Sequence, residues 1–257
     1  MKWPLKTALL SCTDKTDLRP LAEALVARGV HLISTGGTGA MLRTWGIPYQ
    51  EITAYTGHPE AFQGRMKTIS FTAASALLFR RDDPADTLEA AQLNIRPLDL
   101  VVCNLYPFEQ VAREHAEEKT LIENIDIGGP LMVRAAAKNF AHVAVLTSPA
   151  QYAEFIAAFD GTTTLEQRRG WALEAFERVA GYDVAIANEL ASRWQSEPRA
   201  ERFLHLRDAK PLRYGENPHQ VATLYATEGE HSLARARVLQ GKELSYNNML
   251  DADAAWK

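Results

Sequence analysis

The sequence predicts an α/β protein built on a doubly wound, mainly parallel sheet. Short apolar runs of strand length alternate with segments of helical periodicity, and each run ends in a polar loop. Strand, loop and helix alternate in this way twice between residues 7 and 52. This order is typical of βαβ units, whose parallel strands are covered on both faces. Ligands of such sheets bind beyond the carboxyl ends of the strands, so we expect a site in the polar loops.

The first half of the chain supplies the expected elements in order. Asp17 stands where a helix N-cap is expected, and Gly29 ends the apolar periodicity that follows it. The expected strands are residues 7–11, 30–33 and 49–52, and the expected helices are residues 17–29 and 39–45.

The second half continues the pattern and then changes in composition. We expect strands at residues 98–103 and 142–146, and helices from Pro130, over 151–159 and over 165–194. In the last of these, Trp171, Ala175, Val179 and Tyr182 recur at helical spacing, which indicates core packing or an interface rather than a cofactor site. Residues 196–210 are charged and contain a proline, so we predict a first domain over 1–195, a linker over 196–210 and the start of a second domain over 211–257.

Composition narrows the class of function. The 257 residues carry a net charge of −4 with a pI near 6.0, which argues against nucleic acid as the main partner. No apolar run is long enough to span a membrane, and the N-terminus lacks a signal-peptide pattern. The two cysteines, Cys12 and Cys103, have no metal-ligand spacing and fit a reducing compartment. We therefore expect a cytoplasmic protein without a metal.

Two glycine-rich loops are the first candidate sites. Thr35, Gly36, Gly37 and Thr38 follow a predicted strand and begin a helix, which suits a phosphate because a helix N-terminus offers unpaired N–H groups. A second loop, residues 125–130, leads into an alanine-rich helix. Asp126 precedes that helix and Lys138 lies further along it, so we expect a carboxylate and an ammonium to face the same ligand.

Two other segments offer polar groups. Arg65 and Lys67 flank Met66, and an extended backbone would point both cations to one side. Asn104 and Tyr106 follow the buried strand 98–103 and should also lie at the carboxyl edge of the sheet.

Together these motifs resemble the family of bifunctional enzymes that combine 5-aminoimidazole-4-carboxamide ribonucleotide (AICAR) formyltransferase with IMP cyclohydrolase. The resemblance extends over nearly the whole chain, and its motifs occur in family order. They are residues 13–16, 34–38, 65–68, 104–108, 125–129, 134–139, 213–215 and 217–220. The resemblance implies a methylglyoxal-synthase-like fold for the first domain and the start of the transformylase domain after the linker.

The same resemblance implies a set of site residues. Those that would hold the phosphate and ribose are Thr13, Asp14, Lys15, Thr35, Gly36, Gly37 and Thr38. Those that would surround the base are Arg65, Lys67, Thr68, Cys103, Asn104, Asp126, Ile127 and Gly128, with Lys138 as acid/base residue and Tyr106 nearby. Arg213 and Tyr214 resemble a substrate loop of the transformylase domain. The implied reaction closes the ring of 5-formamidoimidazole-4-carboxamide ribotide (FAICAR) to IMP.

One departure keeps alternatives open. After Lys67 and Thr68 the family has a Leu-His-Pro motif and a later histidine, whereas this chain reads ISFTAASA over residues 69–76. A nucleotide- or phosphate-binding regulatory domain is therefore an alternative, because the same fold also serves as an effector module. A methylglyoxal-synthase-type lyase is a third.

The resemblance also sets expectations for cofactors and partners. Ring closure needs no cofactor, while 10-formyltetrahydrofolate is used only by a complete transformylase domain. The catalytic Lys-His pair of that domain lies downstream of residue 257 in the family, so we expect no formyl transfer from this chain alone. The expected partner is a purine ribonucleotide, and the expected assembly is a homodimer.

Overall fold

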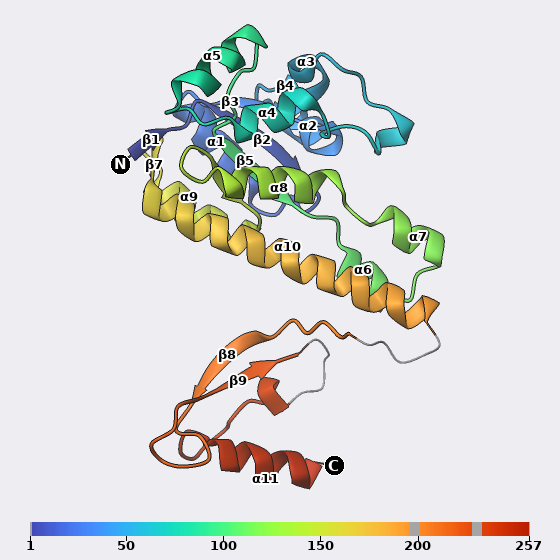
Figure 1. Ribbon diagram of the computed structural model, residues 1–257, viewed down its shortest axis with the longest axis vertical. Helices are drawn as coiled ribbons and strands as arrows, with labels where there is room; N and C mark the ends of the chain where they lie inside the picture. Colours follow the sequence, from blue (N-terminus) through green and yellow to red (C-terminus); the bar gives the residue numbers. More distant parts are fainter. Residues whose placement is uncertain (1, 196–200, 228–232, 257) are drawn as a thin grey trace. The chain divides into compact units, whose positions relative to one another are not determined.

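The computed structural model describes residues 2–195, 201–227 and 233–256 (Figure 1). It divides into two compact units, residues 1–186 and 187–257. Residues 196–200 of the predicted linker lie outside the described residues. The domain boundary at residue 195 therefore stays a prediction.

The first unit is built on a five-stranded sheet in the order β4-β3-β2-β5-β6, with every neighbouring pair parallel. The central pairing joins β2 to β5, where Ala8 lies opposite Leu100 and Cys12 opposite Asn104. Its strands are β2 (Thr7–Cys12), β3 (His31–Ser34), β4 (Gln50–Glu51), β5 (Leu100–Asn104) and β6 (Ala144–Leu146). The predicted α/β class and parallel sheet are confirmed.

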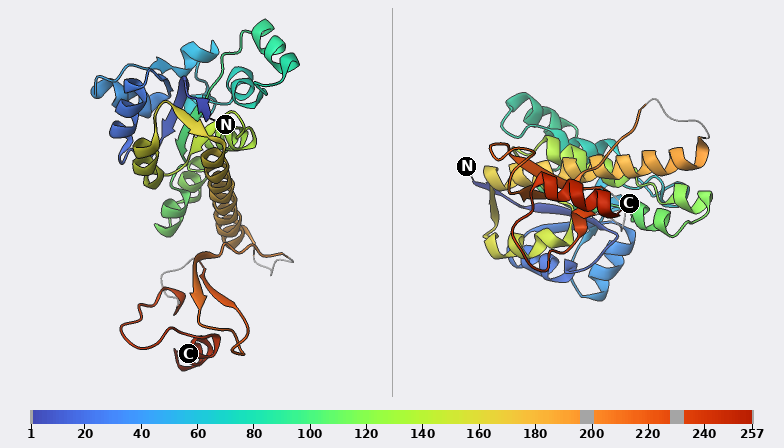
Figure 2. Two further views of the ribbon diagram at one scale, coloured as in Figure 1. Left: turned by 90° about the vertical axis from the view of Figure 1, so that its left-hand side faces the viewer. Right: turned by 90° about the horizontal axis from the view of Figure 1, so that it is seen from below.

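Helices cover both faces because side chains of a strand alternate between faces. On one face Ala8, Leu10 and Val102 pack against α1 (Leu18–Ala27), α2 (Gly36–Thr44) and α9 (Tyr152–Ala158). On the other face α4 (Phe71–Leu78) and α8 (Gly128–Lys138) contact each other, and α8 lies along β5 and β6. In the left view of Figure 2, blue helices and teal helices lie on opposite sides of the strands.

The remaining elements of the first unit connect or border these layers. A two-stranded antiparallel ribbon joins the chain start to residues near 163. These elements are β1 (Lys2–Pro4), α3 (Ile52–Thr56), η1 (Phe62–Gly64), α5 (Pro84–Gln92), α6 (Phe108–Arg113), α7 (Glu118–Glu123), η2 (Pro149–Gln151), β7 (Thr162–Thr164) and α10 (Leu165–Trp194). Of the predicted stripe on α10, Ala175, Val179 and Tyr182 are buried and Trp171 packs against the core, which confirms the core prediction.

Three local predictions differ from the structure. Asp17 occupies the N-cap position of α1, but it has a left-handed backbone and its side chain makes no capping hydrogen bond. Helix α2 begins at Gly36 rather than at Gly39, because glycine tolerates the positive φ of 32° at that position. Arg65 has helical rather than extended backbone angles, so Arg65 and Lys67 do not point to one side.

The second unit contains an antiparallel pair of strands and a helix with no buried residue. Arg213 donates its backbone N–H to Leu244, and its guanidinium lies 4.9 Å from the ring centre of Tyr214. Its elements are β8 (Arg207–Leu212), β9 (Ala222–Ala226), η3 (Leu233–Arg235) and α11 (Tyr246–Trp256). Lys257, which follows helix α11, lies outside the described residues.

Candidate functional site

The carboxyl edge of the sheet, where β2, β3 and β5 end, gathers most of the predicted residues. Asn104 ends β5 and fixes the loop after β2: its Oδ1 accepts from the backbone N–H groups of Thr13 and Asp14 at 2.6 and 2.9 Å. Its Nδ2 donates to the Asp14 carbonyl at 2.7 Å. Asn104 therefore holds this loop in place through its side chain.

The loop after β3 is fixed in a similar way. The Thr38 hydroxyl accepts from the Cys12 N–H and donates to the Cys12 carbonyl, both at 2.9 Å. The Thr35 hydroxyl lies 3.1 Å from that of Ser11. These bonds hold the start of α2 against the end of β2. The Gly36 and Gly37 N–H groups then stand at the first turn, where no intrahelical acceptor exists for them.

Lys15 and Asp14 are engaged within their own loop. Lys15 donates from Nζ to the carbonyls of Cys12 and Thr13, both at 3.1 Å. Asp14 accepts from the Thr16 N–H at 2.9 Å, and its hydrogen bonds to Thr16 lower the pKa of its carboxyl. The ammonium of Lys15 thus lies over the end of β2, close to the loop predicted to hold phosphate.

Lys67 and Thr68 connect two helix starts. A Cβ on Gly36, the first residue of α2, would clash with the Lys67 ammonium. Likewise, a Cβ on Gly128, the first residue of α8, would clash with the Thr68 hydroxyl. Two consecutive residues, Lys67 and Thr68, thereby lie against two helix N-termini. Each N-terminus carries a partial positive charge that favours anions.

Asp126 lies beside the start of α8. Its Oδ1 accepts from the Gly129 N–H at 2.8 Å, and its own N–H donates to the Tyr182 hydroxyl at 2.9 Å. Burial raises the pKa of the Asp126 carboxyl, against the opposing effect of hydrogen bonds from the Gly129 and Tyr106 backbones. A half-buried carboxyl that exchanges protons nearer to neutrality is suited to general acid/base chemistry.

Tyr106 and Cys103 complete this part of the site. Burial, with the nearby charge of Asp126, raises the pKa of the Tyr106 phenol, so it keeps its proton and can donate a hydrogen bond. Cys103 is buried, and burial raises the pKa of its thiol well above the ordinary value. It is therefore a packing residue of the wall rather than a nucleophile. Ile127 is 61% exposed at the rim.

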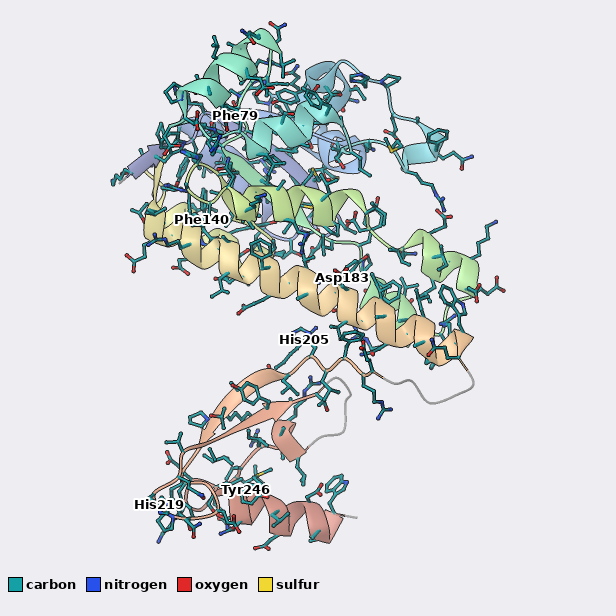
Figure 3. All side chains as sticks on the ribbon, in the orientation of Figure 1. Phe79, Phe140, Asp183, His205, His219 and Tyr246 are labelled. Carbon is teal, nitrogen blue, oxygen red and sulfur yellow. The ribbon has the colours of Figure 1, made fainter. Side chains whose placement is uncertain are left out.

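Two predicted residues of the first unit, Lys138 and Arg65, lie apart from this group. Lys138 is the last residue of α8, about 15 Å from Gly128 along the axis, at the rise of 1.5 Å per residue. It lines a groove with residues of α10, near the end of α8 that Figure 3 marks with Phe140. Within one chain the length of α8 lies between Asp126 and Lys138, and the prediction that they share a pocket stays a prediction.

Arg65 is turned away from Lys67 and forms an ion pair with Glu123 of α7. Arg213 and Tyr214 belong to the second unit, where they contact each other. The roles predicted for all of these residues remain predictions.

Sequence reasoning missed two residues of the site. Tyr182 lies 56 positions from Asp126, and its helical spacing indicated only a core role. Glu60 forms an ion pair with Lys67, with 3.0 Å between Oε2 and Nζ. In the sequence, Glu60 stands seven residues before Lys67 with a glycine between them, and this spacing is the local feature that could have indicated their contact.

Residues 69–76, where the sequence differs from the family motif, form an ordinary start of a helix. Ser70 caps α4 by accepting from the Ala73 N–H at 3.0 Å. Ile69 lies against Gly128 and contributes an apolar contact to the wall. The segment thus keeps its place beside the site without its histidines.

Among the described residues, no three metal-ligating side chains lie together. None of the described helices has the length and hydropathy that a membrane crossing requires.

Comparison with known proteins identifies the relationship. Residues 17–131 match the MGS-like domain, and residues 136–257 match the AICARFT/IMPCHase bienzyme. The chain is 45% identical to the bifunctional purine biosynthesis protein PurH of Mesorhizobium japonicum and 47% identical to that of Xanthomonas campestris, over 99% of its own length in each case. It covers 48% and 50% of those proteins, and so spans about half their length.

One solved structure is also similar to this chain. The crystal structure of ForH superposes with a TM-score of 0.62 at 31% identity, covering 72% of this chain and 99% of ForH. The relatives named PurH are enzymes, so a purely regulatory domain is not favoured. The chain belongs to the AICARFT/IMPCHase bienzyme family.

Proposed function

We propose that this chain is an IMP cyclohydrolase that closes the ring of FAICAR with loss of water. The observation that carries the proposal is the placement of Lys67 and Thr68 across the starts of α2 and α8, beside Asp126. One helix start suits the phosphate of a ribotide. The other, with its half-buried carboxyl and its phenol, suits the reacting groups of the base.

The reaction needs orientation, oxyanion stabilisation and proton transfer. The carboxamide nitrogen attacks the formyl carbon, the C–N bond forms, and the formyl oxygen gains negative charge. We assign to Asp126 the removal of a proton from that nitrogen, because burial leaves its carboxyl with a raised pKa. The Lys67 ammonium and the N–H groups at the start of α8 then stabilise the oxyanion.

Loss of water completes the ring. The former formyl oxygen leaves as water with two protons, one taken from the carboxamide nitrogen and one from the former formamido nitrogen. The C–O bond breaks as that second nitrogen forms the ring C=N bond. We assign to the Tyr106 phenol, which its raised pKa keeps protonated, a hydrogen bond to this oxygen. Holding both reacting groups on one ribotide in one orientation supplies much of the remaining acceleration.

Finer assignments follow from the family. The substrate is a purine ribonucleotide, and ring closure by these residues uses no cofactor. The formyl donor of the bienzyme's other activity is 10-formyltetrahydrofolate. Both described cysteines are free thiols, which supports the cytoplasm as the compartment.

We also propose a homodimer. A groove of about 370 Å³ between α8 and α10 is lined by Ala137, Lys138, Phe140, Arg169, Ala172, Leu173 and Phe176. Leu173 is 61% exposed there, and contiguous exposed apolar surface commonly marks a contact with another chain. Sedimentation velocity at several concentrations tests this, and a monomer throughout would contradict it.

The test of the proposed activity is a spectrophotometric assay. The purified chain, incubated with FAICAR, should form IMP well above the uncatalysed rate, with IMP identified by chromatography. Buffer alone and heat-denatured chain are the controls. Formation of IMP at only the uncatalysed rate would overturn the proposal.

A further inference from the structure

The loop between α3 and α4 holds two opposite charges side by side. Ala61 and Met66 form a short bridge, with hydrogen bonds of 3.0 and 3.2 Å between their backbones. The residues that flank this bridge are Glu60 and Lys67, whose side chains form an ion pair with 3.0 Å between Oε2 and Nζ. The fold of the loop therefore determines that this acid meets this base.

The position of the Lys67 ammonium is electrostatically unfavourable without a counter-charge. It lies against Gly36 at the N-terminus of α2, where the helix dipole places a partial positive charge that repels cations. With the Lys67 side chain 25% exposed, the ammonium could otherwise turn toward water. Glu60 is the carboxylate that compensates for this repulsion.

Glu60 also faces the reacting part of the site. Its charge contributes, after burial and the charges of Asp126 and Cys103, to the raised pKa of the Tyr106 phenol. Glu60 thus lies within electrostatic reach of two groups to which we assign chemistry, Lys67 and Tyr106. Arg65, by contrast, forms its ion pair with Glu123, so it does not compete with Lys67 for the Glu60 carboxylate.

We infer that Glu60 is a positioning residue, which holds the Lys67 ammonium at the start of α2 for use in ring closure. The inference rests on the proposed function, since the benefit of the placement is stabilisation of the oxyanion. Glu60 itself touches no reacting atom in this scheme. It acts through its negative charge, so a side chain of the same shape without the charge does not replace it.

Kinetics with matched variants test the role of the charge. Glu60→Gln should lower kcat about tenfold or more and change KM less than about threefold, since the oxyanion charge assigned to the Lys67 ammonium develops only in the transition state. Glu60→Ala should lose at least as much. Glu23→Gln, which breaks an exposed ion pair on α1, should leave both constants unchanged.

Amine labelling gives a readout that does not need turnover. In Glu60→Gln, acetylation of Lys67 by a limiting acylating reagent, quantified by mass spectrometry against Lys119, should rise about threefold or more. An unchanged rate at Lys67 would overturn the inference, and so would a wild-type kcat in Glu60→Gln. If the wild-type chain forms no IMP, the proposed function fails, while the labelling ratio alone decides whether Glu60 places Lys67.

Discussion

The two edges of the sheet hold similar ion pairs in different surroundings. At the carboxyl edge, Lys67 and Glu60 are 25% and 41% exposed and border the starts of two helices. At the amino edge, Arg81 and Asp99 pair at 2.6 Å with side chains 7% and 6% exposed. The chemistry of the two pairs is nearly the same, so burial and the remaining partners decide what each pair does.

The amino-edge pair is bonded to backbone on nearly every side. Asp99 accepts from the Lys6 and Thr7 N–H groups at 2.8 and 2.9 Å. Arg81 donates to the carbonyls of His142 and Leu98, and only its Nε lacks a partner among the described residues. Burial raises the pKa of Asp99 and lowers that of Arg81, which shows the cost of burying both charges. This pair ties strands together and has no room for a ligand.

The largest expected effect comes from the carboxyl edge. Asp126→Asn retains an oxygen that can accept from the Gly129 N–H but cannot take a proton from the substrate, so kcat should fall by about 10²–10⁴. The measurement is the rate of IMP formation at saturating FAICAR. Thermal unfolding of the variant should match that of the parent chain.

The pH dependence provides a control for the same residue. Burial raises the pKa of Asp126. As the solution is acidified, this base therefore becomes protonated at a higher pH than an ordinary aspartate does, and kcat falls there. The variant should lack this acid limb. A variant with near wild-type turnover and an unchanged pH profile would remove Asp126 from the mechanism.

The amino edge should respond in stability instead. Asp99→Ala leaves the Arg81 guanidinium buried without its counter-charge, which should lower the free energy of unfolding by about 3–5 kcal/mol. Urea denaturation followed by circular dichroism measures this loss. The exposed pair of Arg19 and Glu23 gives the control, because Glu23→Ala should have little effect.

Activity separates the two edges further. Corrected for the folded fraction, the kcat of Asp99→Ala should stay close to that of the parent chain. A large loss of kcat in fully folded Asp99→Ala would mean that the amino edge is coupled to the site, and the comparison would fail.

The sequence predicted the strands and the loops that end them because these depend on local periodicity and on glycine. It predicted Asp126 and Gly128 together for the same reason, since they adjoin in one loop. Tyr182 and Glu60 were missed because their contacts with the site form only when the chain folds. The Tyr182 hydroxyl lies 56 positions from Asp126, and the bridge between Ala61 and Met66 brings Glu60 to Lys67. The shared pocket of Asp126 and Lys138 could not be judged from the sequence, because it depends on the length of the helix between them.

Lys138 is the sharpest test of this geometry and the smallest expected effect. The family resemblance implies an acid/base role, whereas one chain places Lys138 at the far end of α8 from Asp126. If the site is complete within a chain, Lys138→Met should change kcat by less than about threefold, because proton transfer needs contact with the reacting atoms. Met keeps the apolar stem that lines the groove with Phe140.

A hundredfold loss in Lys138→Met would require Lys138 to reach the reacting atoms from a second copy of the chain. Mixing decides this, since Asp126→Asn and Lys138→Met chains would each be inactive, yet a mixed dimer would contain one site with both native residues. With free exchange, about half the dimers are mixed and half their sites are intact, so roughly a quarter of the wild-type activity would return. If the site lies within one chain, the Asp126→Asn and Lys138→Met chains keep their separate rates on mixing, and the mixture shows only their average.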